Sequence, residues 1–312
     1  MRTPASAAVV LGLVLAGWSS TASAARNVIQ KSEEAVVLPV AEQLVTRPAV
    51  AAPHLGKAPV IDGTVGTDEW REAARFTSFL GMKTIHQFRY ETHGFIGWDD
   101  QAVYVAFQAH TIQGHPVTAQ YGPEERDKPV FRDDSMELWL RPKDANYCFM
   151  VNTTGSIADF RSQERFRWDG EWDAKVRATD FGYEGEMRVP FATLEVSPPK
   201  PRDRWTFNLT RYQIRPLWTR GEFSFMGGKF TACHPFHAHL VFVKGLTVRT
   251  DYIGKVRGNK IGVYGRLLNT GEKPVKVTLT YRVMKADDLG GYAFEAAGRN
   301  PQPASPGPTH GS

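Results

Sequence analysis

Hydrophobic and polar residues alternate in short runs between Pro59 and Lys244. Val, Phe, Tyr, Trp and Thr are frequent in these runs, and Gly, Pro or Asp interrupts them repeatedly. Alternation with a period of two predicts half-buried β-strands, and frequent turn residues are typical of a sandwich or barrel. We therefore expect one all-β domain over residues 57–245. Its strands are expected at Phe95–Gln108 (a hairpin), Ser135–Leu140, Tyr147–Asn152, Lys175–Thr179, Tyr183–Val189, Trp205–Tyr212 and His239–Val243.

The strand at Ser135–Leu140 has two chemically different faces. Successive side chains of a strand point to opposite sides of the sheet. Met136, Leu138 and Leu140 therefore fall on one side, and Glu137 and Trp139 fall on the other. The second face carries groups that a hydrophobic core would not favour, so it is a candidate for function.

The chain beyond Gly245 has a different pattern. Lys260–Leu268 and Val275–Val283 are strand-like, and the turn-forming residues 269–274 join them. An isolated hairpin is marginally stable in water. Residues 255–285 are therefore expected to form a partial immunoglobulin-like hairpin, as an incomplete module. The tail over residues 298–312 is rich in Pro, Gly and Ser and is expected to be disordered.

The first 24 residues have the pattern of a secretory signal peptide. Arg2 precedes the apolar run Ala7–Ala16, and the small residues Ala22–Ala24 suit cleavage after Ala24. The run is too short to cross a bilayer, and no later segment offers the ~20 apolar residues that a membrane span needs. We expect a soluble, secreted or periplasmic protein, with residues 25–56 as a linker.

Charge and cysteine content narrow the choice of partner. The formal net charge of +5 becomes +4 without Arg2, because 37 basic residues then face 33 acidic ones. The basic residues are scattered among acidic ones, so nucleic acid is not an expected partner.

Cys148 and Cys233 both lie in strand-like segments. They could form a disulfide in an oxidising compartment or remain two buried thiols, and the sequence leaves both open.

Six local sequences form an ordered set along the chain: Pro59–Trp70, Gly97–Ala109, Arg132–Pro142, Tyr147–Arg161, Tyr183–Leu194 and Trp205–Gln213. In this order, they resemble carbohydrate-binding module family 9 of the DOMON-like superfamily. The resemblance implies an antiparallel, jelly-roll-like β-sandwich whose one face binds a poly- or oligosaccharide. In such a site, indole rings stack on the apolar face of a sugar and charged side chains bond its hydroxyls.

The tryptophans divide into two expected groups. Trp70, Trp98 and Trp205 match positions that define the fold, and we expect them to be buried. The others lie in or near strand ends with charged neighbours, as in the segment 165–175, and we expect an exposed aromatic patch. These candidate stacking residues are Trp139, Trp168, Trp172 and Trp218.

Three interpretations compete for the acidic group Asp133, Asp134 and Glu137. These side chains could bond sugar hydroxyls, hold calcium, or end a loop and pair with a neighbouring arginine. The resemblance favours sugar contact for Asp134 and Glu137. It also implies structural calcium, but no compact loop of Asp, Asn and Gly identifies the ligands.

Two arginines complete the candidate sugar site. Asn208 and Arg211 fall on opposite faces of one strand. Arg211 is the better candidate because its planar guanidinium can bridge two hydroxyls, whereas Asn208 can satisfy buried backbone. Arg161 is a third, weaker choice, because it belongs to a matching segment.

Two other functions compete with carbohydrate binding. A glycoside hydrolase needs two carboxylates about 5 to 10 Å apart across a cleft, and strand residues three apart such as Asp134 and Glu137 face opposite ways. We therefore expect no intrinsic catalysis, but a role beside hydrolases in polysaccharide recognition or breakdown. The second rival is b-type haem binding, and the same histidines could alternatively hold zinc. Its candidate ligands are Met226, His234, His237 and His239.

Overall fold

The computed structural model describes residues 7–17, 48–81, 88–112, 116–162, 164–216, 219–224, 237–253, 263–271, 275–286 and 292–300. These residues form an almost purely β structure, as expected, with one short 3-10 helix, η2 (Val130–Arg132). Within these ranges, no helix has the length and hydrophobicity that crossing a membrane would require.

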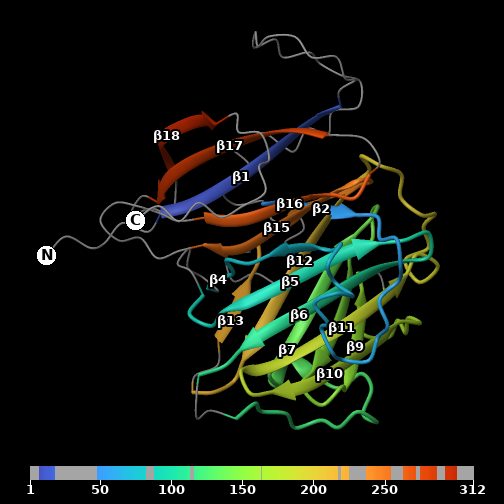
Figure 1. The fold of residues 1–312 in the computed structure, drawn as a ribbon. Coiled ribbons are helices and arrows are strands. Elements are labelled where there is room, and N and C mark those ends of the chain that lie inside the picture. Colours follow the sequence, from blue (N-terminus) through green and yellow to red (C-terminus); the bar gives the residue numbers. More distant parts are fainter. Residues whose placement is uncertain are drawn as a thin grey trace, which may run out of the picture.

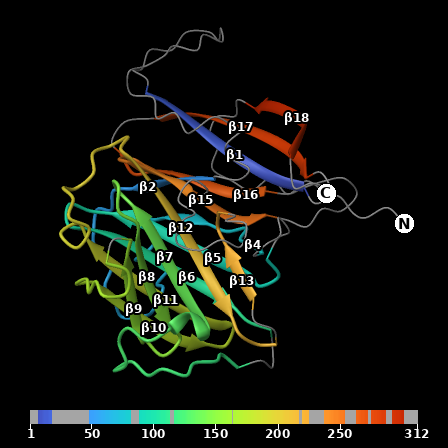
Figure 2. The ribbon, with the colours of Figure 1, turned by 180° about the vertical axis from the view of Figure 1, so that it is seen from behind.

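Two large sheets face each other as the layers of a sandwich (Figures 1 and 2). The first is β10 (Asp173–Thr179), β11 (Gly182–Pro190), β6 (Ala102–His110), β5 (Thr92–Trp98), β3 (Ala74–Phe76), β15 (Leu246–Ile253) and β16 (Val263–Asn269). The second is β2 (Ala49–Pro53), β14 (Ala238–Val243), β12 (Arg204–Gln213), β7 (Ser135–Arg141), β8 (Tyr147–Asn152) and β9 (Ile157–Arg161). Two short strands extend this second sheet: β13 (Thr219–Glu222) pairs with β12, and β4 (Leu80–Gly81) pairs with β13.

The main core lies between the two sheets, and the alternation along each strand builds it. Phe107 from the first sheet and Leu138, Phe149 and Phe207 from the second belong to one buried cluster. Burying each such side chain contributes about 1.5–3 kcal/mol. The expected burial of the three fold-defining tryptophans is confirmed for Trp70, Trp98 and Trp205, which are 1%, 1% and 7% exposed.

The β5–β6 hairpin confirms the predicted turn. The Asp99 carboxylate accepts hydrogen bonds from the backbone N–H groups of Gln101 and Ala102, at 2.7 and 2.8 Å. The Tyr104 hydroxyl donates to the other oxygen of Asp99 at 2.8 Å. An aspartate that bonds the backbone two and three residues ahead fixes the turn and thereby the register of the two strands.

Residues 25–56 were expected to be a linker, but the last part of this segment is a strand of the second sheet. Residues 25–47 lie outside the described part. Ala49–Pro53 forms β2, which pairs in parallel with β14. This strand contains three alanines and a proline, so it lacks the β-branched and aromatic residues by which the others were found. A second parallel contact joins β3 to β15, so both sheets are mixed rather than purely antiparallel.

The strands near the C-terminus pair differently from the expected hairpin of residues 255–285. β16 pairs with β15, while β17 (Val275–Ala286) lies between β1 (Ala7–Gly17) and β18 (Tyr292–Asn300) in a third sheet. The backbone N–H groups of Thr270 and Gly271 both donate to the Gly245 carbonyl, which joins the end of β16 to the start of β15. The predicted disordered tail begins inside β18, and residues 301–312 lie outside the described part.

Candidate functional site

The outer face of the second sheet carries a row of polar side chains across three strands. Glu137 of β7 stands opposite Thr210 of β12, and Thr210 stands opposite Glu222 of β13. In the next row, Tyr212 of β12 stands opposite Arg220 of β13. All five side chains are buried, from 0% to 3% exposed. Polar groups at this depth need partners, so their hydrogen bonds define what the face can bind.

Glu137 is the group at the centre of this face. Its Oε2 accepts hydrogen bonds from the Trp139 indole Nε1 at 3.0 Å and from the Thr210 hydroxyl at 2.8 Å. Its Oε1 is buried and has no hydrogen-bond partner within the described part of the chain. Burial raises the pKa of the Glu137 carboxyl, although the bond from Trp139 and the nearby Arg220 act in the opposite direction.

Arg220 joins the remaining members of the row. Its guanidinium donates to the Glu222 carboxylate, with the Nε to Oε1 bond at 2.8 Å, and to the Tyr212 hydroxyl at 3.2 Å. Burial raises the pKa of Tyr212, so its hydroxyl stays protonated at neutral pH. The face therefore combines a carboxylate acceptor, a buried ion pair and two hydroxyls, which is donor and acceptor chemistry suited to a hydroxyl-rich ligand.

The expected exposure of Trp139 and Trp172 is wrong, because these rings are 1% and 7% exposed. Trp139 packs beside Phe160 and His237, with ring centroids 6.1 and 6.0 Å apart. Each buried indole N–H needs an acceptor, and the neighbouring carboxylates supply it. Trp139 donates to Glu137, Trp172 to Asp159 at 3.0 Å and Trp70 to Glu186 at 2.7 Å.

The candidate tryptophans do not share one surface. Trp139 lies on the outer face of the second sheet, in a cluster with Cys148 and Phe160. Trp172 belongs to the core cluster between the sheets, and the half-buried Trp168 packs against that same cluster. Trp218 lies outside the described residues.

Asp134 and Arg211 hold the structure together in the interior. The Asp134 carboxylate accepts hydrogen bonds from the backbone N–H groups of Thr118 and Ile214, at 2.7 and 2.6 Å. Arg211 is 0% exposed and points between the sheets, where its guanidinium donates to four oxygens. Asn208 is on the opposite face, as predicted. Its side-chain amide donates to the Ser224 carbonyl and accepts from the Ser224 backbone N–H, both at 2.8 Å.

Arg161 is held at the edge of the second sheet. Its guanidinium makes a bidentate ion pair with Glu195, at 2.9 and 2.8 Å, and lies 5.6 Å from the centroid of the Tyr147 ring. Both contacts keep it away from the row around Glu137. The structure therefore brings Glu137 and Trp139 together and separates the other predicted site residues from them.

The structure describes only part of the haem, zinc and disulfide candidates. Met226, Cys233 and His234 lie outside the described residues, so these predictions stay predictions. Cys148 is buried on the outer face, where burial raises the pKa of its thiol well above the usual value. Of the acidic group with three competing interpretations, Asp133 accepts hydrogen bonds from the backbone N–H of Gln120 and from the side chain of Asn152.

The fold is similar to that of family 9 carbohydrate-binding modules. Two structures of such modules from Caldicellulosiruptor kristjanssonii, with cellotriose and with glucose, both have a TM-score of 0.46, at 16% and 18% sequence identity. The alignments cover 63% and 67% of this chain and 94% and 100% of those chains. A Bacteroides uniformis protein, described provisionally as carbohydrate-binding, has a TM-score of 0.49 at 14% identity over 62% of this chain and 97% of its own. No protein-family model matches the sequence, and no curated protein matches it.

Sequence reasoning found Glu137 and Trp139 but missed the other members of the row. Arg220 and Glu222 are separated by one residue, so they share a face of β13. This spacing was visible in the sequence. The strand is only four residues long, however, and its place beside β12 depends on pairing that the sequence does not show.

Proposed function

We propose that this protein binds carbohydrate, without catalysis of its own, through the outer face of the second sheet around Glu137 and Trp139. The observation that carries the proposal is Glu137 Oε1, a buried carboxylate oxygen without a partner among the described residues. A sugar hydroxyl is a neutral donor that can satisfy this oxygen. The sequence resemblance to family 9 carbohydrate-binding modules supports the same ligand class.

The neighbouring groups fit a saccharide rather than an ion. Thr210 and Tyr212 offer hydroxyls, and Arg220 adds a guanidinium already neutralised by Glu222. The face is closed to solvent in this structure, so a saccharide must displace the side chains over Glu137 when it enters. Trp218 directly precedes β13 in the sequence and remains our candidate for the stacking ring.

The test is a glycan array followed by calorimetric titration of the hits. Glu137→Gln keeps the size of the side chain and replaces one acceptor oxygen by a donor. A hydrogen bond to a charged group contributes about 1.5–3 kcal/mol, so affinity should fall roughly 10- to 150-fold. Trp218→Ala should also weaken binding, since stacking rings dominate such interfaces.

Arg161→Met is the matched control, because Arg161 bonds Glu195 at the sheet edge and should leave affinity unchanged. Equal affinity of Glu137→Gln and wild type, with both folded, would refute the site. Release of reducing sugar during titration would refute the absence of catalysis.

We further propose that the protein is exported and supports polysaccharide recognition or breakdown outside the cytoplasm. The support is the sequence of residues 1–24, with its apolar run and its Ala-x-Ala ending. Part of this segment, Ala7–Gly17, is β1 and pairs with β17 in the full chain. Cleavage after Ala24 would therefore remove one strand of the third sheet.

A further inference from the structure

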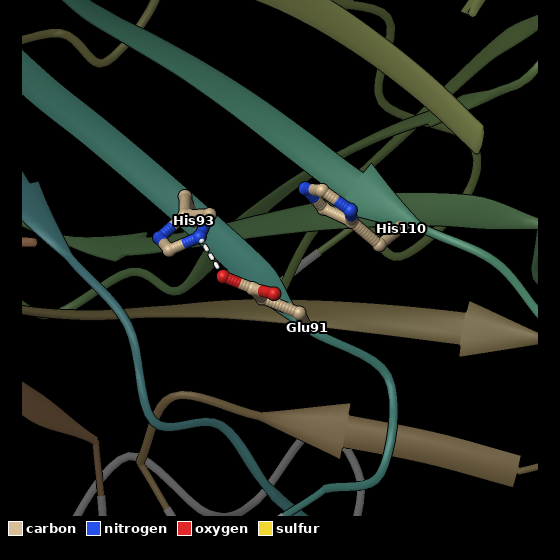
Figure 3. A group of neighbouring side chains, drawn as sticks. All are labelled: Glu91, His93 and His110. Carbon is tan, nitrogen blue, oxygen red and sulfur yellow. Dashed lines mark hydrogen bonds and ion pairs between the residues drawn. The ribbon is translucent and has the colours of Figure 1, made fainter. Parts of the chain in front are cut away.

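Three metal-binding side chains meet at one end of the β5–β6 hairpin, on the outer face of the first sheet. Glu91 directly precedes β5, His93 is its second residue, and His110 is the last residue of β6. The His110 backbone N–H donates to the Glu91 carbonyl at 2.9 Å, which places these two residues opposite each other. The β-sheet period of two puts His93 on the same face as Glu91. Figure 3 shows the Glu91 carboxylate next to the His93 ring, with the His110 ring on the neighbouring strand.

The donor atoms converge closely enough to share one ion. One ligand atom from each residue lies within 4.8 Å of the other two, and His93 Nε2 is 2.7 Å from Glu91 Oε1. Zinc bonds nitrogen and oxygen ligands at about 2.0–2.2 Å in tetrahedral geometry, so two ligand atoms of one ion lie about 3.3–3.6 Å apart. Side-chain shifts of roughly 1–1.5 Å therefore bring all three donors within bonding distance.

The backbone beneath the cluster is held from the opposite sheet. Arg211 of β12 reaches across the interior and donates to the Glu91 carbonyl at 3.2 Å and to the His110 carbonyl at 2.6 Å. The His110 ring also stacks on Phe181, with centroids 4.6 Å apart. These contacts fix the two strand ends whose side chains converge, which is the support that a metal site requires.

The cluster is buried on one side and open on the other. His93 is 3% exposed, whereas the Glu91 side chain is 55% exposed, so an ion can enter from solvent. Burial lowers the pKa of both His93 and His110, while the Glu91 carboxylate acts in the opposite direction.

Two nearby arginines affect the binding of a cation. The positive charges of Arg75 and Arg211 act on the histidines of the cluster and oppose a bound cation, although Arg75 is paired with Asp251 at 3.0 Å. Glu91 is the carboxylate that offsets them. Two imidazoles and one carboxylate suit Zn²⁺ and related transition metals, whereas Ca²⁺ needs six or more oxygens.

We propose that Glu91, His93 and His110 bind a divalent transition-metal ion, and Zn²⁺ is the ion that we expect first. The remaining coordination positions face solvent on the Glu91 side. The site lies on the opposite sheet from Glu137, so it is independent of the proposed saccharide face.

The test is calorimetric titration of the untagged protein with ZnCl₂, with thermal unfolding in the presence and absence of zinc as a second readout. Wild type should bind one Zn²⁺ per chain at this site, and saturating zinc should raise the unfolding temperature. Glu91→Gln and His110→Gln should each weaken binding at least about tenfold. Both side chains are partly exposed, so these variants should fold, whereas the buried His93→Gln needs a circular dichroism check.

His54→Gln is the matched control, because His54 also has a carboxylate beside it, with Asp100 at 3.3 Å. It should bind zinc like wild type. The proposal is overturned if wild type shows no saturable binding. It is also overturned if zinc binds but Glu91→Gln and His110→Gln leave the affinity unchanged, since the ion would then occupy other residues.

Discussion

Arg211→Met tests whether the buried guanidinium joins the two sheets. Arg211 donates to the carbonyls of Glu91 and His110, the Thr92 hydroxyl and the Gln213 side-chain oxygen, at 2.6–3.2 Å. Methionine keeps most of the volume between Tyr90 and Tyr183, whose rings lie 5.6 and 5.4 Å from the guanidinium carbon. The substitution therefore removes the donors and leaves the packing largely in place.

The expected loss follows from the acceptors that are left without a donor. The Glu91 carbonyl keeps its bond from the His110 N–H, so three acceptors are at risk. Each buried acceptor without a partner costs about 1–3 kcal/mol, and relief from burying a charge offsets part of the sum. We expect Arg211→Met to lower the free energy of unfolding by about 3–5 kcal/mol. The free energy of unfolding of a typical domain is only about 5–15 kcal/mol, so this loss is a large part of it.

The assay is equilibrium urea denaturation followed by tryptophan fluorescence. Arg161→Met is the control, because its partner Glu195 is 60% exposed and such a pair contributes about 0–1 kcal/mol. A smaller or equal loss for Arg211→Met would refute the account of its role. Because Arg211 also holds the backbone of Glu91 and His110, the same variant should bind zinc more weakly than Arg161→Met does.

Two further predictions concern Glu137 and the N-terminus. Burial raises the folded-state pKa of Glu137 above its ordinary value of 4.5, so its contribution to stability is present below that pH and is lost as pH rises through the folded value. Glu137→Gln should therefore gain stability relative to wild type as the pH rises above about 4.5, and a difference that stays constant with pH in urea titrations would contradict it. For export, intact mass of the protein secreted by its native host should show a first residue at Ala25, and a mass that includes Met1 would contradict cleavage.

Most strands could be predicted because their segments are rich in β-branched and aromatic residues and are bounded by turn residues. The six residues Tyr147–Asn152 were predicted with both ends correct, and β12 extends only one residue beyond the prediction at each end. β2 could not be found this way, because its sequence is three alanines, one valine and a proline, which are mostly poor strand formers. β16 pairs with the preceding strand β15, and β17 pairs with β1 and β18, although the turn residues between β16 and β17 would suit a hairpin equally well.

The site was only partly predictable, for a reason that lies in the chemistry of indole. A tryptophan with acidic neighbours was interpreted as exposed, but a buried indole N–H requires an acceptor and a carboxylate is a strong one. The pairs Trp139–Glu137 and Trp172–Asp159 each satisfy this need inside the protein. Acidic residues beside tryptophan therefore do not distinguish a binding platform from a buried polar pair.

These carboxylates differ in how their oxygens and their charge are satisfied. Both oxygens of Glu186 are occupied, one by Trp70 and the other by the backbone N–H groups of Asp62 and Gly63. Asp159 Oδ1 also has no hydrogen-bond partner among the described residues, but the Arg126 guanidinium compensates the charge of Asp159 and bonds the same oxygen as Trp172. Glu137 has neither arrangement: Arg220 beside it is bonded to Glu222, and Oε1 has no acceptor role among the described residues. A buried carboxylate oxygen left in this way is costly unless a ligand donates to it, and this cost is the physical reason for placing the saccharide at Glu137.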